Sequence, residues 1–92
     1  MTSERLETLL MVYIYNEINR KGFVNRKDLE KFEVENGVDF DQIKVALDDF
    51  KERNFVKISI RQKPNSDYFS LLIDKINAEG LHFLNSRVQE TQ

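Results

Sequence analysis

The hydrophobic period of this chain changes from helical to alternating near residue 54. Before that point, apolar residues recur every three or four positions from Asp39 to about Asn54, which is the pattern of an amphipathic helix. These positions are Ile43, Ala46, Leu47 and Phe50. From Phe55 to Gln62, apolar and polar residues alternate, as in a half-buried strand. The change predicts an α+β domain in which a helix leads directly into a strand.

Residues that cap helices predict three further helices. Asn25 is followed by an acid at Asp28, the spacing of a capping box, and the helix of Asp39 repeats it with Gln42. The three helices are expected from Ser3 to about Lys21, from Asn25 to Asn36 and Gly37, and from Asn77 towards the C-terminus. Gly80 lies inside the last helix, where glycine costs about 1 kcal/mol relative to alanine, so we attribute it to close packing against a neighbour.

A β-hairpin is expected between the last two helices. The segment 63–67 combines proline, asparagine, serine and aspartate, which favour a turn, and Tyr68–Ile73 supplies a second strand. A very short extended segment is also expected at Phe23 and Val24. The predicted order is therefore helix, short strand, helix, helix, two-stranded hairpin and helix.

Length and composition point to one domain covering residues 1–92, with tails at about 1–3 and 89–92. Ninety-two residues with 40% hydrophobic content suit a single core. The chain has no cysteine and no leader-like N-terminus, which favours an intracellular, cytoplasmic protein. Its longest apolar run, Leu9–Tyr15, has seven residues, too few for the roughly 20 that cross a bilayer.

The first helix is apolar on nearly every side at its middle. Met11, Val12 and Tyr15 project away from the stripe that should face the core. Two explanations stay open for these three residues. Other elements of the domain cover them, or they form the interface of a homodimer.

The order of elements resembles that of winged helix-turn-helix proteins: a three-helix core, a β-hairpin wing and a C-terminal helix. The resemblance is carried by "GFVNRKDLEKFEVENGVDFDQIKVALDDFKERNFVKI" and by the closing segment "INAEGLHFL". The closing segment is similar to the last helix of small bacterial and phage winged-helix proteins, including the YjcQ-like group, with Asn77 where threonine is usual. The resemblance implies a recognition helix at 39–54 that enters a DNA major groove, and a wing that reaches the backbone.

Residues at the start of the two central helices and on the wing are the candidates for duplex DNA contact. They are Arg26, Lys27, Gln42, Lys44, Val45, Lys57, Arg61 and Lys63. For the wing cations, ordinary protection of an exposed strand is an equal alternative. The net charge of −2 gives no general attraction to nucleic acid, so any cationic surface must be local.

The solvent-facing side of the expected recognition helix favours a second hypothesis. Its later turns carry Asp48, Asp49 and Glu52, and acids placed along a DNA groove are repelled by phosphate. A non-enzymatic protein-interaction module that binds a basic partner through these acids is therefore the alternative. We expect no enzyme, because the single histidine, His82, should be solvent-exposed and no catalytic, metal or cofactor motif accompanies it.

Overall fold

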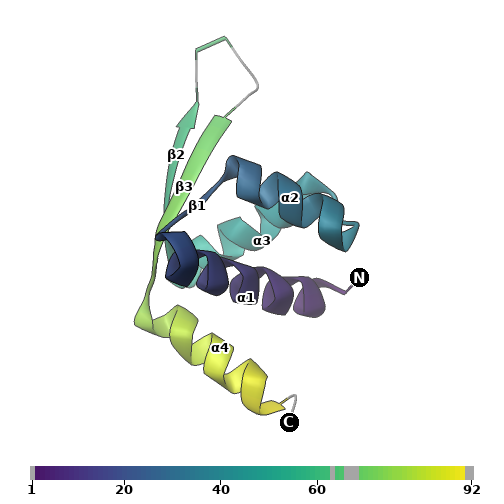
Figure 1. Cartoon of the computed structure of the whole chain (residues 1–92), viewed down its shortest axis with the longest axis vertical. Coiled ribbons are helices and arrows are strands. Elements are labelled where there is room, and N and C mark those ends of the chain that lie inside the picture. The colour runs from purple at the N-terminus through teal and green to yellow at the C-terminus, as the bar shows by residue number, and fades with distance from the viewer. Residues whose placement is uncertain (1, 63, 66–68, 91–92) are drawn as a thin grey trace.

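The computed structural model describes residues 2–62, 64–65 and 69–90. Within these residues it contains four helices and a three-stranded antiparallel sheet, so the α+β class is confirmed. The elements are α1 (Ser3–Lys21), β1 (Val24–Asn25), α2 (Arg26–Asn36), α3 (Phe40–Glu52), β2 (Val56–Gln62), β3 (Phe69–Ile76) and α4 (Ala78–Glu90). Figure 1 shows α1, α2 and α3 packed together, the β2–β3 hairpin extending past them, and α4 beneath α1.

The sheet has the strand order β1-β3-β2, so β3 is central and β2 is an edge strand. Val24 of β1 pairs with Ile73, and Ile58 of β2 pairs with the same residue from the other side. The β2–β3 register shifts between Lys57 and Ile58, which marks a β-bulge. Beyond the bulge, pairing continues to Val56 and Ile76.

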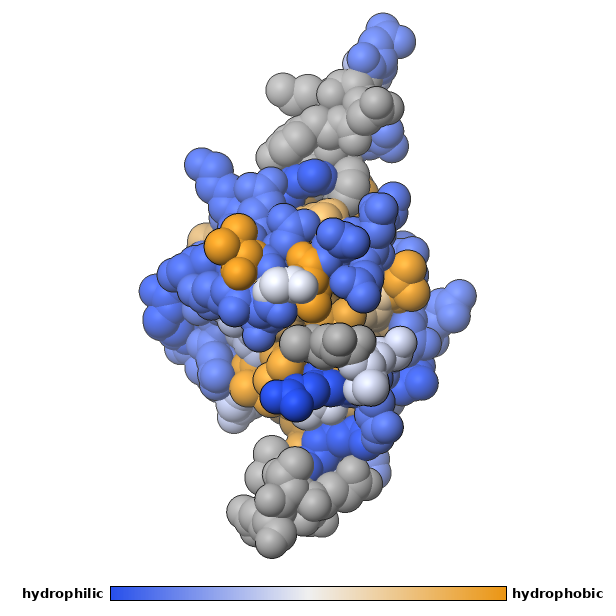
Figure 2. Space-filling model, turned by 90° about the vertical axis from the view of Figure 1, so that its right-hand side faces the viewer, coloured by the Kyte–Doolittle hydropathy of each residue, from blue (hydrophilic) through white to orange (hydrophobic). Residues whose placement is uncertain are grey.

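One hydrophobic core joins the helices to the inner face of the sheet. The side chains with the least exposure come from α1, β1, α2, α3 and β3: Leu10, Met11, Ile14, Val24, Leu29, Ile43, Phe50 and Ile73. The predicted stripe of α3 is buried in full. No helix among the described residues is long and apolar enough to cross a membrane. Figure 2 shows separate hydrophobic groups on a mostly hydrophilic surface, on the side where α1 begins.

Most of the predicted helix ends are confirmed. Asn25 and Asp28 form the expected capping box, and the Asp39 N–H donates to Gln42 Oε1 at 3.0 Å. The first cap is different, because Thr2 rather than Ser3 accepts from the N–H of Arg5. The expected tails are shorter than predicted: α1 begins at Ser3 and α4 continues to Glu90. Residues 1 and 91–92 lie outside the described residues.

The strands differ from prediction at three points. β1 occupies Val24–Asn25 rather than Phe23 and Val24, and β3 runs to Ile76 rather than Ile73, because pairing with β2 continues past the bulge. Ile60, expected on the buried face, is 52% exposed, since the hairpin extends past the helices that would cover it. Of the predicted turn, Pro64 and Asn65 are in a turn, and Lys63, residues 66–67 and Tyr68 lie outside the described residues.

Of the two explanations for the apolar middle of α1, coverage by the domain itself holds for Met11. Its side chain is fully buried, because α4 lies across this side of α1. The contact is close at Gly80, where an added Cβ would stand 2.8 Å from Ile76 Cγ2 and 3.2 Å from Met11 Cε. It would also collide with the Phe55 carbonyl oxygen. The predicted packing role of Gly80 is confirmed, and the domain itself covers one of the two extra faces of α1.

Candidate nucleic-acid interface

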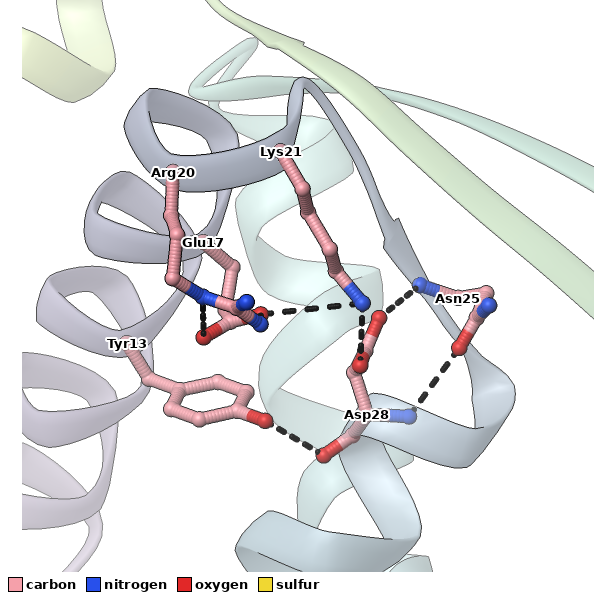
Figure 3. A network of polar contacts seen from close by, with 6 residues as sticks. All are labelled: Tyr13, Glu17, Arg20, Lys21, Asn25 and Asp28. Atoms are coloured by element: carbon pink, nitrogen blue, oxygen red, sulfur yellow. Dashed lines mark hydrogen bonds and ion pairs between the residues drawn. The ribbon is translucent and has the colours of Figure 1, made fainter.

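A polar network fixes the start of α2 on the C-terminal half of α1 (Figure 3). The Tyr13 hydroxyl donates to the Asp28 carbonyl oxygen at 2.9 Å, and Lys21 Nζ lies 2.5 Å from Asp28 Oδ1. The other oxygen of the Asp28 side chain accepts from the Asn25 N–H at 2.9 Å. Asp28 thus closes the α2 cap and joins it to α1, which sets the position of the helix pair α2–α3.

The pKa shifts in this network follow from its hydrogen bonds and from burial. Burial by itself would raise the pKa of Asp28, but the hydrogen bonds from the Asn25 backbone and the Lys21 ammonium outweigh it, and the pKa is lowered. The hydrogen bond from Arg20 lowers the pKa of Glu17. Burial, with Glu17 and Asp28 nearby, raises the pKa of Tyr13 to about 12. The Tyr13 hydroxyl therefore remains a donor throughout the physiological range.

The two candidate cations of α2 are placed differently. Arg26 lies 3.2 Å from Glu30 and its guanidinium carbon lies 4.6 Å from the centre of the Phe40 ring, so it joins α2 to the first residue of α3. Lys27 is exposed. Arg26 therefore helps to position the helix pair, and Lys27 presents a charge to solvent.

The first turns of α3 present the candidate base-reading residues. Gln42 is exposed, but its side-chain oxygen already caps the helix, so the amide nitrogen is what it can offer to a base edge. Lys44 is exposed, and Val45 is 70% exposed. Lys44 lies on the flank of α3 that faces the hairpin, where it shares a narrow cleft with Ile58 and Ile60.

The hairpin carries Lys57 and Arg61, both exposed, at its base and further along β2. Lys63 lies outside the described residues. Lys44 and Lys57 therefore lie where α3 and the hairpin meet.

The acids of α3 do not form one surface. Asp41, Asp48 and Glu52 are exposed and fall on one side of the helix, which is called the acidic face below. At the edge of this face, Asp48 also lines the cleft that contains Lys44 and Lys51. Asp49 differs from the expectation: it is half-buried and lies 3.2 Å from Arg53, on the flank towards α1.

Glu7 of α1 lies beside Asp49. Burial, with the charge of Asp49 and a hydrogen bond to it, raises the pKa of Glu7. Only Asp48 and Glu52 of the three predicted partner-binding acids therefore belong to the open face.

The two remaining candidates for a dimer interface are partly exposed. Val12 is 37% exposed and Tyr15 is 41% exposed, and both lie on α1. Because Met11 is buried within the domain, it has no surface to contribute to such an interface.

Two cations absent from the predicted site lie next to Lys57. Lys75 is its cross-strand partner, and Lys51 of α3 lines the same groove. From the sequence, we expected Lys51 only as a solvent-facing residue of a helix, and we expected the second strand to end at Ile73. The signal that could have found Lys75 was continued alternation past Asp74, but the bulge interrupts it.

His82 is exposed, as expected. In the part of the chain that the structure describes, no group of three or more His, Asp or Glu side chains could hold a metal ion. No protein-family model, curated protein or solved structure matches this chain.

Proposed function

We propose that this chain is a winged helix-turn-helix domain that binds duplex DNA and regulates transcription, as a binding module rather than an enzyme. The observation that carries the proposal is the placing of α2 and α3 beside a hairpin whose exposed side bears Lys57 and Arg61, with β1 completing the sheet against β3. A helix pair followed by a cationic hairpin is the arrangement by which winged helices hold a major groove and its flanking phosphates.

The distribution of charge sets how a duplex would lie. The first turns of α3 offer Lys44, Val45 and the amide of Gln42 beside one acid, Asp41, whereas Asp48 and Glu52 lie in the later turns. Phosphate repels carboxylates, so the N-terminal turns enter the groove and the last turn stays outside it. Lys27 and Arg61 then contact the backbone on either side.

A duplex titration at several salt concentrations tests the proposal. We expect binding that weakens as salt rises, because neutralised phosphates release counterions. Reversing the charges in the double variant Lys57→Glu/Arg61→Glu should reduce the affinity by about tenfold or more and should flatten the salt dependence. The control is Lys31→Glu, which reverses a charge on the exposed side of α2. Lys51 is left out of the control because it lies beside Lys57.

Two results would count against the proposal. One is the absence of binding to any duplex at low salt. The other is an equal loss in the Lys31→Glu control, which would mean that only the total charge matters.

A protein-interaction module is the second candidate, and the acidic face favours it. Val45, 70% exposed, shares this side of α3 with Asp48 and Glu52, so an apolar group is bordered by acids. A basic partner with one apolar anchor would complement this surface. The double variant Asp48→Asn/Glu52→Gln separates the two functions: it should weaken a basic protein partner and strengthen duplex binding.

Dimerisation through α1 belongs to the proposal as well. Val12 and Tyr15 would pair with the same residues of a second copy about a two-fold axis. Light scattering on the full chain, with Val12→Ser/Tyr15→Ser as the variant, measures it. A monomeric mass at every concentration would remove dimerisation from the proposal while leaving the DNA contact open to test.

A further inference from the structure

The base of the hairpin borders an open groove of about 480 Å³ that contains three lysines. The groove is lined by Lys51 of α3, Lys57 of β2 and Lys75 of β3, with Asn54, Val56, Ile58 and Asn77 between them, and we call it the lysine groove. All three lysines are exposed. Its volume lies in the range of pockets that hold small ligands.

The lining of the lysine groove carries three positive charges and no carboxylate. Two acids lie close by: Asp48 lines the neighbouring cleft together with Lys51, and Glu79, which accepts from Asn54 Nδ2 at 3.3 Å, faces a separate groove beside α4. Asp74 precedes Lys75 at the bulge. A local excess of cations therefore stands on a chain whose net charge is −2.

Lys57 and Lys75 are direct cross-strand partners. Side chains of such a pair extend from the same face of the sheet, and two like charges in this position destabilise it. An acid in place of either lysine would relieve the repulsion. Repulsion between the two lysines thus lowers the stability of the free protein. An anion bound between the two ammonium groups would attract both of them and would stabilise the folded state.

Protection of an exposed sheet edge does not account for all three lysines. Lysines on an edge strand discourage pairing with other chains, and Lys57 is on the edge strand β2. Lys75, however, is on the central strand β3, and Lys51 is on a helix. What the three lysines share is the groove that they line, not a strand edge.

The backbone around the lysine groove is held in place by hydrogen bonds. Asn54 adopts a left-handed conformation with φ of 60° between α3 and β2, and its carbonyl oxygen accepts from Asn77 Nδ2 at 3.0 Å. The Asn77 N–H donates to the Phe55 carbonyl oxygen at 2.9 Å. The three elements that carry the lysines are therefore tied together before any ligand binds, which reduces the ordering cost of binding.

We propose that the lysine groove is an anion-binding site for a ligand that carries two or more phosphate groups. Phosphate is the chemistry that several ammonium donors around one opening favour, because each Nζ has three donors and no acceptor. The site shares Lys57 with the proposed DNA contact, but its other two lysines lie outside that contact, and it needs none of the residues at the first turns of α3. A free oligophosphate and the backbone of a bound nucleic acid both supply this chemistry.

Titration of the full chain with inorganic tripolyphosphate, without DNA, tests the site. We expect saturable binding with one ligand per chain and amide shifts centred on residues 51, 57 and 75. The variant Lys51→Gln/Lys75→Gln should weaken binding by at least about tenfold, since each charged hydrogen bond contributes roughly that factor. The matched control Arg5→Gln/Lys31→Gln, which removes the same charge from the exposed sides of α1 and α2, should bind as the natural chain does.

Absence of saturable binding, equal losses in both variants, or amide shifts elsewhere on the molecule would overturn the site. Circular dichroism of each variant shows that a loss is not caused by unfolding. A duplex added to the complex then identifies the source of phosphate. If it displaces tripolyphosphate, the groove holds nucleic-acid backbone; if both stay bound, the groove takes a free oligophosphate.

Discussion

Lys51 and Glu52 are neighbours in the sequence, yet they belong to two regions of opposite charge. Glu52 lies on the acidic face of α3, with Asp41 and Asp48, and Lys51 lies in the lysine groove with Lys57 and Lys75. Consecutive residues of a helix point about 100° apart, so one helix serves both regions. The net charge of −2 does not show this separation, because it is a sum over the whole chain, whereas a ligand contacts only one of the two surfaces.

The two regions share one property, since each holds like charges in adjacent positions. Asp48 and Glu52 are one helical turn apart, and Lys57 and Lys75 are cross-strand partners. Both arrangements reduce the stability of the free domain. They differ in their setting: the acidic face is one convex helix surface, whereas the lysine groove joins three elements.

The largest effect is expected at Gly80, where α4 meets the backbone beside the lysine groove. In Gly80→Ala the new Cβ would meet the Phe55 carbonyl oxygen and Ile76. Overpacking of this kind costs about 1–3 kcal/mol or more, which exceeds the gain of about 1 kcal/mol in helix propensity. Urea denaturation should show a less stable protein. Asn85→Ala, on the exposed side of α4, is the control, and a stabilised Gly80→Ala would refute the close contact.

Reversing one charge in the lysine groove should stabilise the domain. Lys75→Glu converts a repulsive cross-strand pair with Lys57 into an attractive one, a gain of about 0.2–1 kcal/mol. The same variant should lose tripolyphosphate binding, so stability and binding move in opposite directions. Thermal unfolding at low salt measures the gain, and an unchanged or lower midpoint would contradict the cross-strand register.

The corresponding change on the acidic face should have a smaller effect. Glu52→Lys places an attractive charge four residues after Asp48 and a cation at the C-terminus of α3, and together these give about 0.5 kcal/mol. Denaturation at low and high salt checks it, because an exposed pair is screened by salt. Tripolyphosphate binding should stay the same or strengthen slightly, because Glu52 lies outside the lysine groove.

The smallest effect is expected at Glu7, where α1 meets Asp49. The pKa of Glu7 is raised, so the stability that its neutral form provides is complete below the ordinary value of 4.5 and is lost as the pH rises through the folded-state value. Glu7→Gln should therefore raise the unfolding temperature at pH 7 and make little difference below pH 4.5. A benefit that is equal at both pH values, or one shared by Glu35→Gln on α2, would argue against a cost of burying the Glu7 charge beside Asp49.

The sequence predicted the elements better than the surfaces. The caps at Asn25 and Asp39, the buried stripe of α3 and the packing role of Gly80 are confirmed, because each depends on interactions within a few residues or on one residue type. The exposure of Asp49 and Ile60 was predicted incorrectly. Each depends on whether a distant element covers that position.

The candidate site shows the same limit. Lys57 and Lys44 were chosen from their positions on single elements, and the structure places both on exposed surface. The partnership of Lys75 with Lys57 required the register across a bulge, and the inclusion of Lys51 required the angle between α3 and the hairpin. Neither the register nor the angle can be predicted from a local sequence pattern.

The amino-acid sequence by itself determined the order of the helices and strands and most of the helix ends, since periodicity, caps and turn residues act over one or two turns of chain. The tertiary structure decided which charges share a surface. It joined Lys51 to Lys57 and Lys75, and placed Met11 beneath α4. The physical reason is that burial and electrostatic neighbourhood depend on distances between elements, which only the packing of the whole chain fixes.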